Sequence, residues 1–304
     1  MLFMNDIRQD NLIFKIFPIF THPYILIMRL DRPIGYILLF YPICFAIFAF
    51  SDLNLKIVSL LIIFLIGSIV MRSAGCIIND LLDRDIDNKV RRTQNRPLVS
   101  NSLSIKNSII LLIVLLSIGL IVLIQLNLPS IILALVIVPL VFLYPLAKRY
   151  FFLPQFVLAF TYNWGCFIGW SSLESPSSFT EISILFLSLV LWTIIYDTVY
   201  ATQDEDDDRK LSLKSSALLF GKYKLVILNF LIILMYSLLM LFGKNLGFNF
   251  LFFIFLTLQL ILNLMDLNYI WKNDSLRSGF YFNRNNYYGI FLLLSIIIGS
   301  QLNV

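Results

Sequence analysis

Two acidic clusters are the groups in this sequence whose types and spacing are best suited to chemistry. The first contains Asn79, Asp80, Asp83 and Asp87, and the second contains Asp204 and Asp208. On a helix, residues four apart share one face, so Asn79, Asp83 and Asp87 would form a stripe. Carboxylates one turn apart repel each other. The spacing therefore indicates that a hard cation lies between the oxygens.

Magnesium fits these clusters because Mg²⁺ accepts one or two protein carboxylates and takes its remaining ligands from water and substrate phosphate. We therefore predict two Mg²⁺ sites that face a shared diphosphate. Solvated acidic loops are the alternative. Two such clusters, each at the end of an apolar segment on one membrane face, argue against it. Asp85, Asp206 and Asp207 point off the stripes and are expected to be solvated or to support the ligands.

Arg72 lies inside an apolar segment, two turns before Asn79. An arginine in hydrocarbon costs about 2.5 kcal/mol or more, so this side chain should face the interior of a helix bundle. There it either pairs with a nearby aspartate or holds an anionic group of a substrate. We favour the substrate role.

Other cations are predicted on the same side of the membrane as the acidic clusters: Arg92, Arg96, Lys148, Arg149 and Lys214. Any one of them alone would be explained by membrane topology. However, Arg92 and Arg96 closely follow the first cluster, and Tyr144 and Lys148 place a phenol and an ammonium one turn apart. Together they could neutralise the charge that develops on a leaving diphosphate.

The elements that must position these groups are membrane helices. Of the 304 residues, 59% are hydrophobic and 13% are charged, against about 25% charged in average soluble domains. Uncharged runs such as 108–126 are long enough to cross a bilayer. We predict an all-α integral membrane protein with nine spans, at residues 33–51, 57–80, 108–126, 128–147, 154–172, 182–202, 223–243, 247–265 and 286–303.

The lysines and arginines predict the orientation. Lys56 and Lys244 fall at odd-numbered connections and Arg72 inside a span, whereas the others cluster in the N-terminal segment and around the connections after spans two, four, six and eight. Cytoplasmic loops accumulate these residues, so we place the N-terminus and both acidic clusters in the cytoplasm. The net charge of +5 then reflects topology, and we expect no nucleic-acid partner.

A single domain is expected over residues 1–304, built from two halves at about 1–147 and 148–304, because the acidic clusters follow spans two and six. Cys44, Cys76 and Cys166 lie in apolar runs without CxxC spacing, so we expect reduced, buried thiols. The first 30 residues lack the pattern of a removable signal peptide.

These motifs resemble those of the UbiA superfamily of intramembrane prenyltransferases, and most of all its 4-hydroxybenzoate polyprenyltransferase branch. The resemblance covers nearly the whole chain. It includes NDxxDxxxD at 79–87, RTxxRPL at 92–98, YxxxK at 144–148 and the second acidic motif at 204–208. The branch is indicated by MRSAGC at 71–76, YDTVYATQDEDDD at 196–208 and LKSSALLFG at 213–221. Glu205 departs from the basic residue expected after the aspartate.

The resemblance implies a nine-helix bundle around a central cavity that opens sideways to lipid. It also implies electrophilic substitution, in which Mg²⁺ and the cations draw off the diphosphate and the polyprenyl group joins 4-hydroxybenzoate ortho to its hydroxyl, a step of ubiquinone biosynthesis. Asp197 would orient or deprotonate the phenol, or alternatively pair structurally within its helix. Arg72 would bind the substrate carboxylate, and Tyr144 and Lys148 would take part in catalysis.

The expected location is the bacterial inner membrane, with the mitochondrial inner membrane as the alternative. Two rival functions remain open. Within the superfamily, the acceptor could be a naphthoate, homogentisate or haem. Outside it, a transporter would also carry intramembrane charges, but it predicts acidic residues near the bilayer midplane, whereas here they lie at the ends of spans.

Overall fold

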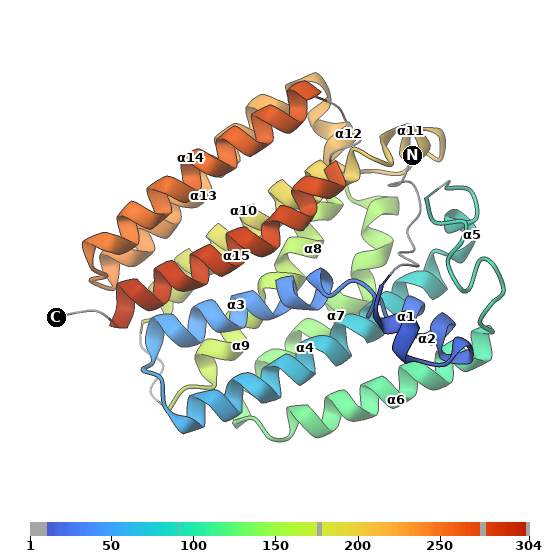
Figure 1. The fold of residues 1–304 in the computed structure, drawn as a ribbon, viewed down its shortest axis with the longest axis horizontal. Helices are drawn as coiled ribbons and strands as arrows, with labels where there is room; N and C mark the ends of the chain where they lie inside the picture. The colour runs from blue at the N-terminus through green and yellow to red at the C-terminus, as the bar shows by residue number, and fades with distance from the viewer. Residues whose placement is uncertain (1–10, 91, 175–177, 274–277, 302–304) are drawn as a thin grey trace.

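A computed structural model describes residues 11–90, 92–174, 178–273 and 278–301, and these residues form helices joined by loops, with no strand among them. The long helices lie side by side in one bundle (Figure 1). They are α3 (Ile34–Phe50), α4 (Leu55–Leu82), α6 (Ile105–Leu123), α7 (Leu128–Tyr150), α10 (Phe179–Ala201), α13 (Lys224–Asn245), α14 (Phe250–Asn273) and α15 (Ser278–Gln301). The shorter ones are α1 (Ile13–Ile16), η1 (Ile19–Thr21), α2 (His22–Ile27), α5 (Arg84–Asp87), α8 (Pro154–Asn163), α9 (Gly165–Ser171), α11 (Glu205–Lys210), α12 (Ser216–Phe220) and η2 (Gly221–Tyr223).

Each of the nine predicted segments is helical where the structure describes it, but only part of the predicted membrane topology is confirmed. Among the described residues, six helices are long and apolar enough to cross a membrane: 55–82, 105–123, 128–150, 179–201, 216–245 and 250–272. The helix of the first predicted span, α3, has 17 residues, and the fifth predicted span is divided at Trp164 into α8 and α9. Nine crossings therefore remain a prediction.

Side-chain caps fix where several of these helices begin. Asn54, Ser104 and Asn127 stand before α4, α6 and α7, and each accepts a hydrogen bond from the backbone N–H three residues later. Such caps satisfy N–H groups that have no partner within the helix. Capping residues in the polar connections thus set where these three helices begin.

Helix α10 forms the centre of the bundle, whereas α6 and α7 form its outer surface. Within an 18-residue apolar stretch of each helix, 72% of the residues are buried in α10, against 11% in α6 and 17% in α7. The main apolar core joins α10 to α3, α8, α9, α13, α14 and α15. Because α6 and α7 show apolar side chains outward along their length, hydrocarbon is the solvent that suits them.

Glycines allow two helix pairs to approach closely. A Cβ atom at Gly289 of α15 would lie 2.3 Å from the ring of Tyr41 on α3, and one at Gly169 of α9 would lie 3.0 Å from Ile43. Small residues at membrane helix contacts permit this backbone approach. The Tyr41 hydroxyl also donates to the Asn286 side chain at 2.8 Å, so the α3–α15 contact combines close packing with a polar pair.

The last two predicted spans have wrong boundaries. We expected a polar connection from 266 to 285, but α14 continues to Asn273 and α15 begins at Ser278. The polar residues in this stretch are tolerated because they find partners in the bundle. Tyr288 donates to Asp266 at 2.6 Å, Arg284 pairs with Asp266 at 3.1 Å, and the Trp192 indole donates to Asn285 at 2.8 Å.

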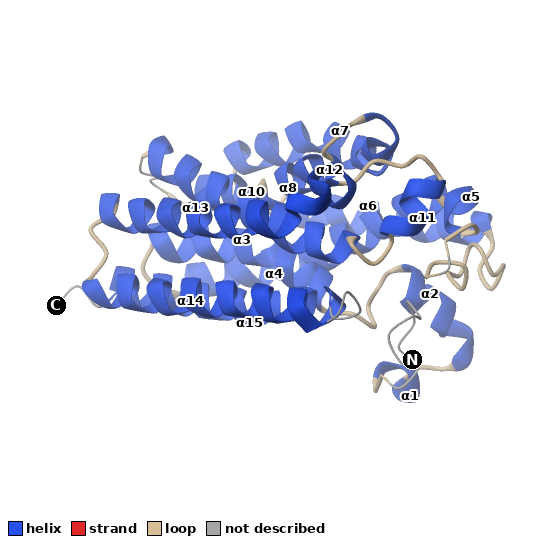
Figure 2. Cartoon of the chain, turned by 90° about the horizontal axis from the view of Figure 1, so that it is seen from above, coloured by secondary structure: helices blue, strands red, loops and turns tan. Residues whose placement is uncertain are grey.

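The two ends of the bundle differ. Helices α5 and α11, with the connections around them, lie together at one end, and α1 and α2 lie beside that end, away from the C-terminal end of α15 (Figure 2). This site-bearing end carries both acidic clusters.

Candidate active site

Both acidic clusters are built on the same local backbone. α4 ends at Leu82, and Asp83 takes φ −100° and ψ 6° before α5 begins. Asp204 takes φ −104° and ψ 6° immediately before α11. In each case the aspartate four residues later donates its backbone N–H to the first aspartate's carbonyl at 2.8 Å. The helix of the predicted stripe is interrupted at Asp83, but the one-turn spacing persists.

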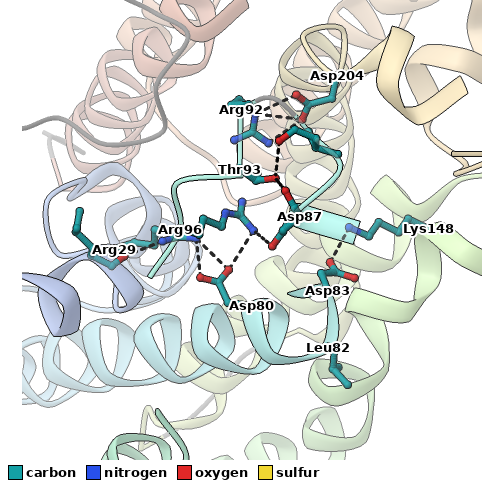
Figure 3. Close-up of polar contacts among 12 residues, drawn as sticks. Arg29, Asp80, Leu82, Asp83, Asp87, Arg92, Thr93, Arg96, Lys148 and Asp204 are labelled. Carbon is teal, nitrogen blue, oxygen red and sulfur yellow. Dashed lines mark hydrogen bonds and ion pairs between the residues drawn. The ribbon is translucent and has the colours of Figure 1, made fainter. Parts of the chain in front are cut away.

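The carboxylates of the first cluster are buried and paired with cations (Figure 3). Asp80 accepts hydrogen bonds from Arg29 at 2.9 Å and from Arg96 at 3.1 Å, and Arg96 also bonds Asp87 at 2.7 Å. Lys148 and Arg149 lie 2.6 and 3.2 Å from the two oxygens of Asp83. The predicted pairing of this cluster with basic residues is therefore present.

Arg92 joins the two clusters across the site. It follows the first cluster in sequence, and its guanidinium bonds Asp204 of the second cluster at distances from 2.7 to 3.2 Å. The same group donates to the Tyr200 hydroxyl at 3.1 Å. Arg92 thus links the connection after the first cluster to the second cluster, more than a hundred residues later in the chain.

The charge balance differs among the carboxylates. Burial, followed by repulsion from Asp204, raises the pKa of Asp208 to about 6. The pKa of Asp87 is also raised, first by burial, although Arg96 opposes the shift. In both cases the main cause is burial, which disfavours the charged form of a carboxyl group.

The carboxylate and amide side chains of the two clusters are suitable ligands for a divalent metal, although the described residues are not arranged as a metal site. Among the described residues, no three acidic, histidine or cysteine side chains converge closely enough to hold an ion, and cations occupy most of the carboxylates. No hydrogen bond or ion pair to another described residue is recorded for the side chains of Asn79 and Asp208. Carboxylate and amide oxygens fit Mg²⁺.

A cavity of about 320 Å³ lies among α3, α4, α6, α7, α8 and α9. Its wall is almost entirely apolar, and the exceptions include Arg72, Tyr144 and Tyr162. The Arg72 guanidinium lies 5.5 Å from the centre of the Tyr162 ring, and its buried Nε has no hydrogen-bond partner. Within the described ranges Arg72 forms no ion pair with an aspartate, which supports the predicted substrate role over the structural one.

Asp197 stands apart from this cavity. It lies on α10, near Gln155 of α8, and Gln155 accepts a hydrogen bond from the Ser216 backbone N–H at 2.8 Å. Asp197 does not line the cavity. Both roles considered for Asp197, in proton transfer and in pairing within its own helix, remain predictions.

Lys214 is not brought to the carboxylates by any recorded contact. Its ammonium donates to the Tyr150 carbonyl at 2.8 Å and lies 4.3 Å from the centre of the Phe152 ring. Asp85 and Asp206 are exposed, as expected, and Asp207 pairs with Lys210 at 3.6 Å. Glu205, the departure from the family pattern, pairs with Lys224 at the start of α13.

The sequence analysis missed three residues of this site. Arg29 bonds Asp80 from the N-terminal segment, Tyr200 bonds Arg92, and Tyr162 covers Arg72. Arg29 also adopts a left-handed backbone with φ 57°, which is strained for a residue other than glycine. Nothing local in the sequence connects Arg29 to Asp80, which lies 51 positions away.

The sequence matches the UbiA prenyltransferase family over residues 39–287. The chain belongs to this family. It is 46% identical over 203 residues to a mitochondrial 4-hydroxybenzoate polyprenyltransferase of Drosophila pseudoobscura pseudoobscura, a match that covers 66% of this chain and 51% of the relative. It is 38% identical over 274 residues to a 4-hydroxybenzoate octaprenyltransferase of Haemophilus ducreyi, covering 90% of this chain and 98% of that one.

Solved structures share the UbiA fold. An apo UbiA homologue from Aeropyrum pernix K1 superimposes with a TM-score of 0.72 at 23% identity, covering 87% of this chain and 97% of the other. A UbiA homologue from Archaeoglobus fulgidus, solved with GPP and Mg²⁺, gives a TM-score of 0.68 at 17% identity, covering 90% and 99%. The chain spans about half the length of the two Drosophila relatives that it matches.

Proposed function

We propose that this protein transfers a polyprenyl group from a Mg²⁺-bound polyprenyl diphosphate to 4-hydroxybenzoate, at the ring carbon ortho to the hydroxyl, as a membrane step of ubiquinone biosynthesis. The observation that carries the proposal is the pair of acidic clusters, joined by Arg92, at the end of the bundle whose apolar cavity holds Arg72. The relatives named as 4-hydroxybenzoate prenyltransferases support the choice of acceptor.

The residues that would hold the metal are the six members of the two clusters: Asn79, Asp80, Asp83, Asp87, Asp204 and Asp208. Bound there, Mg²⁺ would act as a Lewis acid on the diphosphate oxygens. The A. fulgidus homologue solved with GPP and Mg²⁺ supports this ligand class. In the present conformation cations neutralise most of these carboxylates, so we expect Arg29 or Arg96 to release Asp80 when the metal binds.

The released cations would then be available to the leaving diphosphate. Arg92, Arg96, Lys148 and Arg149 already lie at the carboxylates, within reach of any phosphate bridged to them. Positive charge fixed where the negative charge develops lowers the barrier to breaking the allylic C–O bond. Lys214 remains in this set as a prediction, since it would have to leave the Tyr150 carbonyl.

The apolar cavity suits the rest of the substrate. A polyprenyl tail matches its wall, and the exclusion of water would protect an allylic cation from hydrolysis. Arg72 would receive the carboxylate of the acceptor, because its Nε is buried without a partner. Tyr144, which lines the same cavity, would contact the reacting groups, and Asp197 would accept the phenol or ring proton.

We also propose nine membrane crossings, a single domain over residues 1–304 composed of the two predicted halves, and a cytoplasmic site-bearing end in the bacterial inner membrane. The distribution of lysine and arginine supports this orientation.

The proposal is tested with purified protein in lipid nanodiscs, Mg²⁺, a polyprenyl diphosphate and a panel of aromatic acids, followed by mass spectrometry. We expect a prenylated 4-hydroxybenzoate whose formation stops when EDTA removes the metal. Product from a naphthoate or homogentisate but not from 4-hydroxybenzoate would reassign the acceptor. Solute flux in proteoliposomes without any product would instead support a transporter.

Arg72 offers a sharper test of the acceptor. Removing a charged hydrogen-bond partner costs about 1.5–3 kcal/mol, so Arg72→Gln should raise the KM for 4-hydroxybenzoate about 10- to 100-fold. The KM for the diphosphate substrate should change little. An equal rise in both values would show that Arg72 supports the whole site and does not hold the acceptor.

A further inference from the structure

The N-terminal segment, residues 11–31, lies outside the helix bundle and beside its site-bearing end (Figure 2). It contains α1, η1 and α2. None of these helices is long enough to cross a membrane, and the proposed reaction uses none of their apolar side chains. What the segment does is therefore a separate question from the activity of the site.

The segment has an inward face that docks on the bundle. Ile25 and Ile27 are buried, and Ile27 belongs to an apolar cluster with Val70 and Ala74 of α4 and Leu115 of α6. Tyr24 and Met28 pack against the same cluster. These contacts hold α2 against the second half of α4 and against α6.

The opposite edge is apolar and uncovered by the described chain. We call it the apolar edge, and its members are 49–83% exposed: Leu12, Ile16, Phe17, Ile19 and Phe20. Five large apolar side chains in nine positions are more than scattered surface hydrophobics, and such a patch marks an interaction surface.

The apolar edge is held in a defined shape and is not a loose tail. The Phe14 and His22 rings meet edge to face at 4.9 Å, and the His22 imidazole hydrogen-bonds the Phe17 carbonyl at 3.0 Å. Asn11 donates to the Asp31 carbonyl at 2.7 Å, which closes the segment into a loop. The edge is therefore presented in one fixed direction.

The residues near the apolar edge favour lipid as its partner. The first turns of the neighbouring helix α6 expose Ile105, Ile109 and Ile110, so the apolar edge lies near the end of the apolar belt that faces hydrocarbon. Lys15, next to Ile16, is exposed. A short apolar edge accompanied by a basic residue, at the depth where spanning helices end, is typical of segments that lie in the membrane interface.

We propose that the apolar edge inserts into the head-group region of the membrane on the site-bearing side. The same segment carries Arg29, whose guanidinium holds both oxygens of Asp80 at 2.9 Å. The membrane surface would thus fix the position of the segment that delivers Arg29 to the acidic cluster.

The test uses the full chain in lipid nanodiscs with a fluorophore on a single introduced cysteine. The three native cysteines are buried, and unsubstituted protein checks that they do not react. Phe20→Cys and Ile16→Cys report on the apolar edge, and Ser102→Cys, at an exposed position in the connection before α6, is the matched control. Quenching is measured with lipids spin-labelled at a shallow or a deep acyl position and with aqueous iodide.

We expect shallow spin-labelled lipid to quench the labels at positions 16 and 20 more strongly than deep spin-labelled lipid or iodide does, and iodide to quench the label at position 102. Iodide access at position 20 equal to that at 102 would overturn the proposal. Protection from both quenchers would also overturn it, because protein would then cover the edge. Energy transfer between differently labelled copies would identify a second copy as that cover. The proposed catalytic function is unaffected by any of these outcomes.

Discussion

The two acidic clusters share a backbone but differ in their surroundings. Asp83 and Asp204 have nearly the same φ and ψ values and are each followed by an aspartate one turn later. However, Asp83 is fully buried between Lys148 and Arg149, whereas the Asp204 side chain is 18% exposed and the Asp208 side chain pairs with no cation among the residues that the structure describes. The same local motif is thus placed once inside the bundle and once at its surface.

We therefore expect the two clusters to contribute differently to stability and to turnover. The first cluster is neutralised by cations from three parts of the chain, so it contributes to stability as well as to the proposed chemistry. In the second, burial followed by repulsion from Asp204 raises the pKa of Asp208 to about 6. Substitutions in the first cluster should therefore affect folding and turnover together, and those in the second mainly turnover.

The largest expected effect is on turnover. Asp83→Asn should reduce kcat by at least about a hundred- to a thousandfold, the range seen when one preorganised electrostatic contact is removed from an active site. Asp85→Asn changes an exposed carboxylate two positions away and should leave kcat nearly unchanged. If both variants retain activity in a product assay, the first cluster does not hold the metal.

The free energy of unfolding should respond differently to a substitution in the first cluster and to one in the second. Asp80→Asn leaves Arg29 without its buried carboxylate, whereas Arg96 keeps Asp87. The substitution should lower the free energy of unfolding by about 3–5 kcal/mol. Asp208→Asn removes repulsion and should leave stability unchanged or slightly increased. Thermal unfolding without metal, followed by a thiol-reactive dye that labels the buried cysteines on exposure, measures both. Equal losses would contradict the proposed difference between the clusters.

The coupling energy of the Arg92–Asp204 contact, which joins the clusters, should be smaller than the loss of stability expected for Asp80→Asn. A double-mutant cycle with Arg92→Gln and Asp204→Asn should give a coupling energy of about 1–3 kcal/mol, as for a charge-assisted hydrogen bond that is partly shielded from water. Lys56 and Glu174, an exposed pair at 2.7 Å, are the control and should couple by less than about 1 kcal/mol. A coupling near zero for Arg92 and Asp204 would show that the clusters are positioned independently.

The smallest effect is the pH dependence. The pKa of Asp208 is raised to about 6 and that of Asp87 is raised as well, so the folded chain binds protons more tightly than the unfolded chain. Metal-free protein should therefore gain stability, by about 1 kcal/mol, as pH falls through 6 toward 4, and lose it as pH rises through the same range. Asp208→Asn should remove much of this gain.

Mg²⁺ binding should show the opposite trend over the same interval, because protons compete with the metal for the carboxylates. The half-saturating Mg²⁺ concentration, measured by metal-dependent thermal stabilisation, should rise as pH falls below 6. A value independent of pH between 5 and 7 would place the metal away from Asp208.

The sequence by itself determined the helical class, the approximate positions of most long helices and the one-turn spacing of the carboxylates in the two clusters. Each of these follows from local pattern: uncharged apolar runs, helix caps such as Asn54 and carboxylates one turn apart. The one-turn spacing of Asp83 and Asp87 even persisted where the helix was interrupted, because backbone hydrogen bonds between neighbours maintain it.

Only the tertiary structure decided which groups meet. Arg29 reaches Asp80 across 51 positions and Arg92 reaches Asp204 across 112, and no local pattern encodes such distances because helix packing sets them. The extra turns of α14 and α15 were missed for the same reason, since their polar residues are satisfied by side chains on other helices. Packing also places Arg72 at the wall of an apolar cavity, where it pairs with no aspartate of the described ranges. This setting is a property of six helices together and not of the segment that contains Arg72.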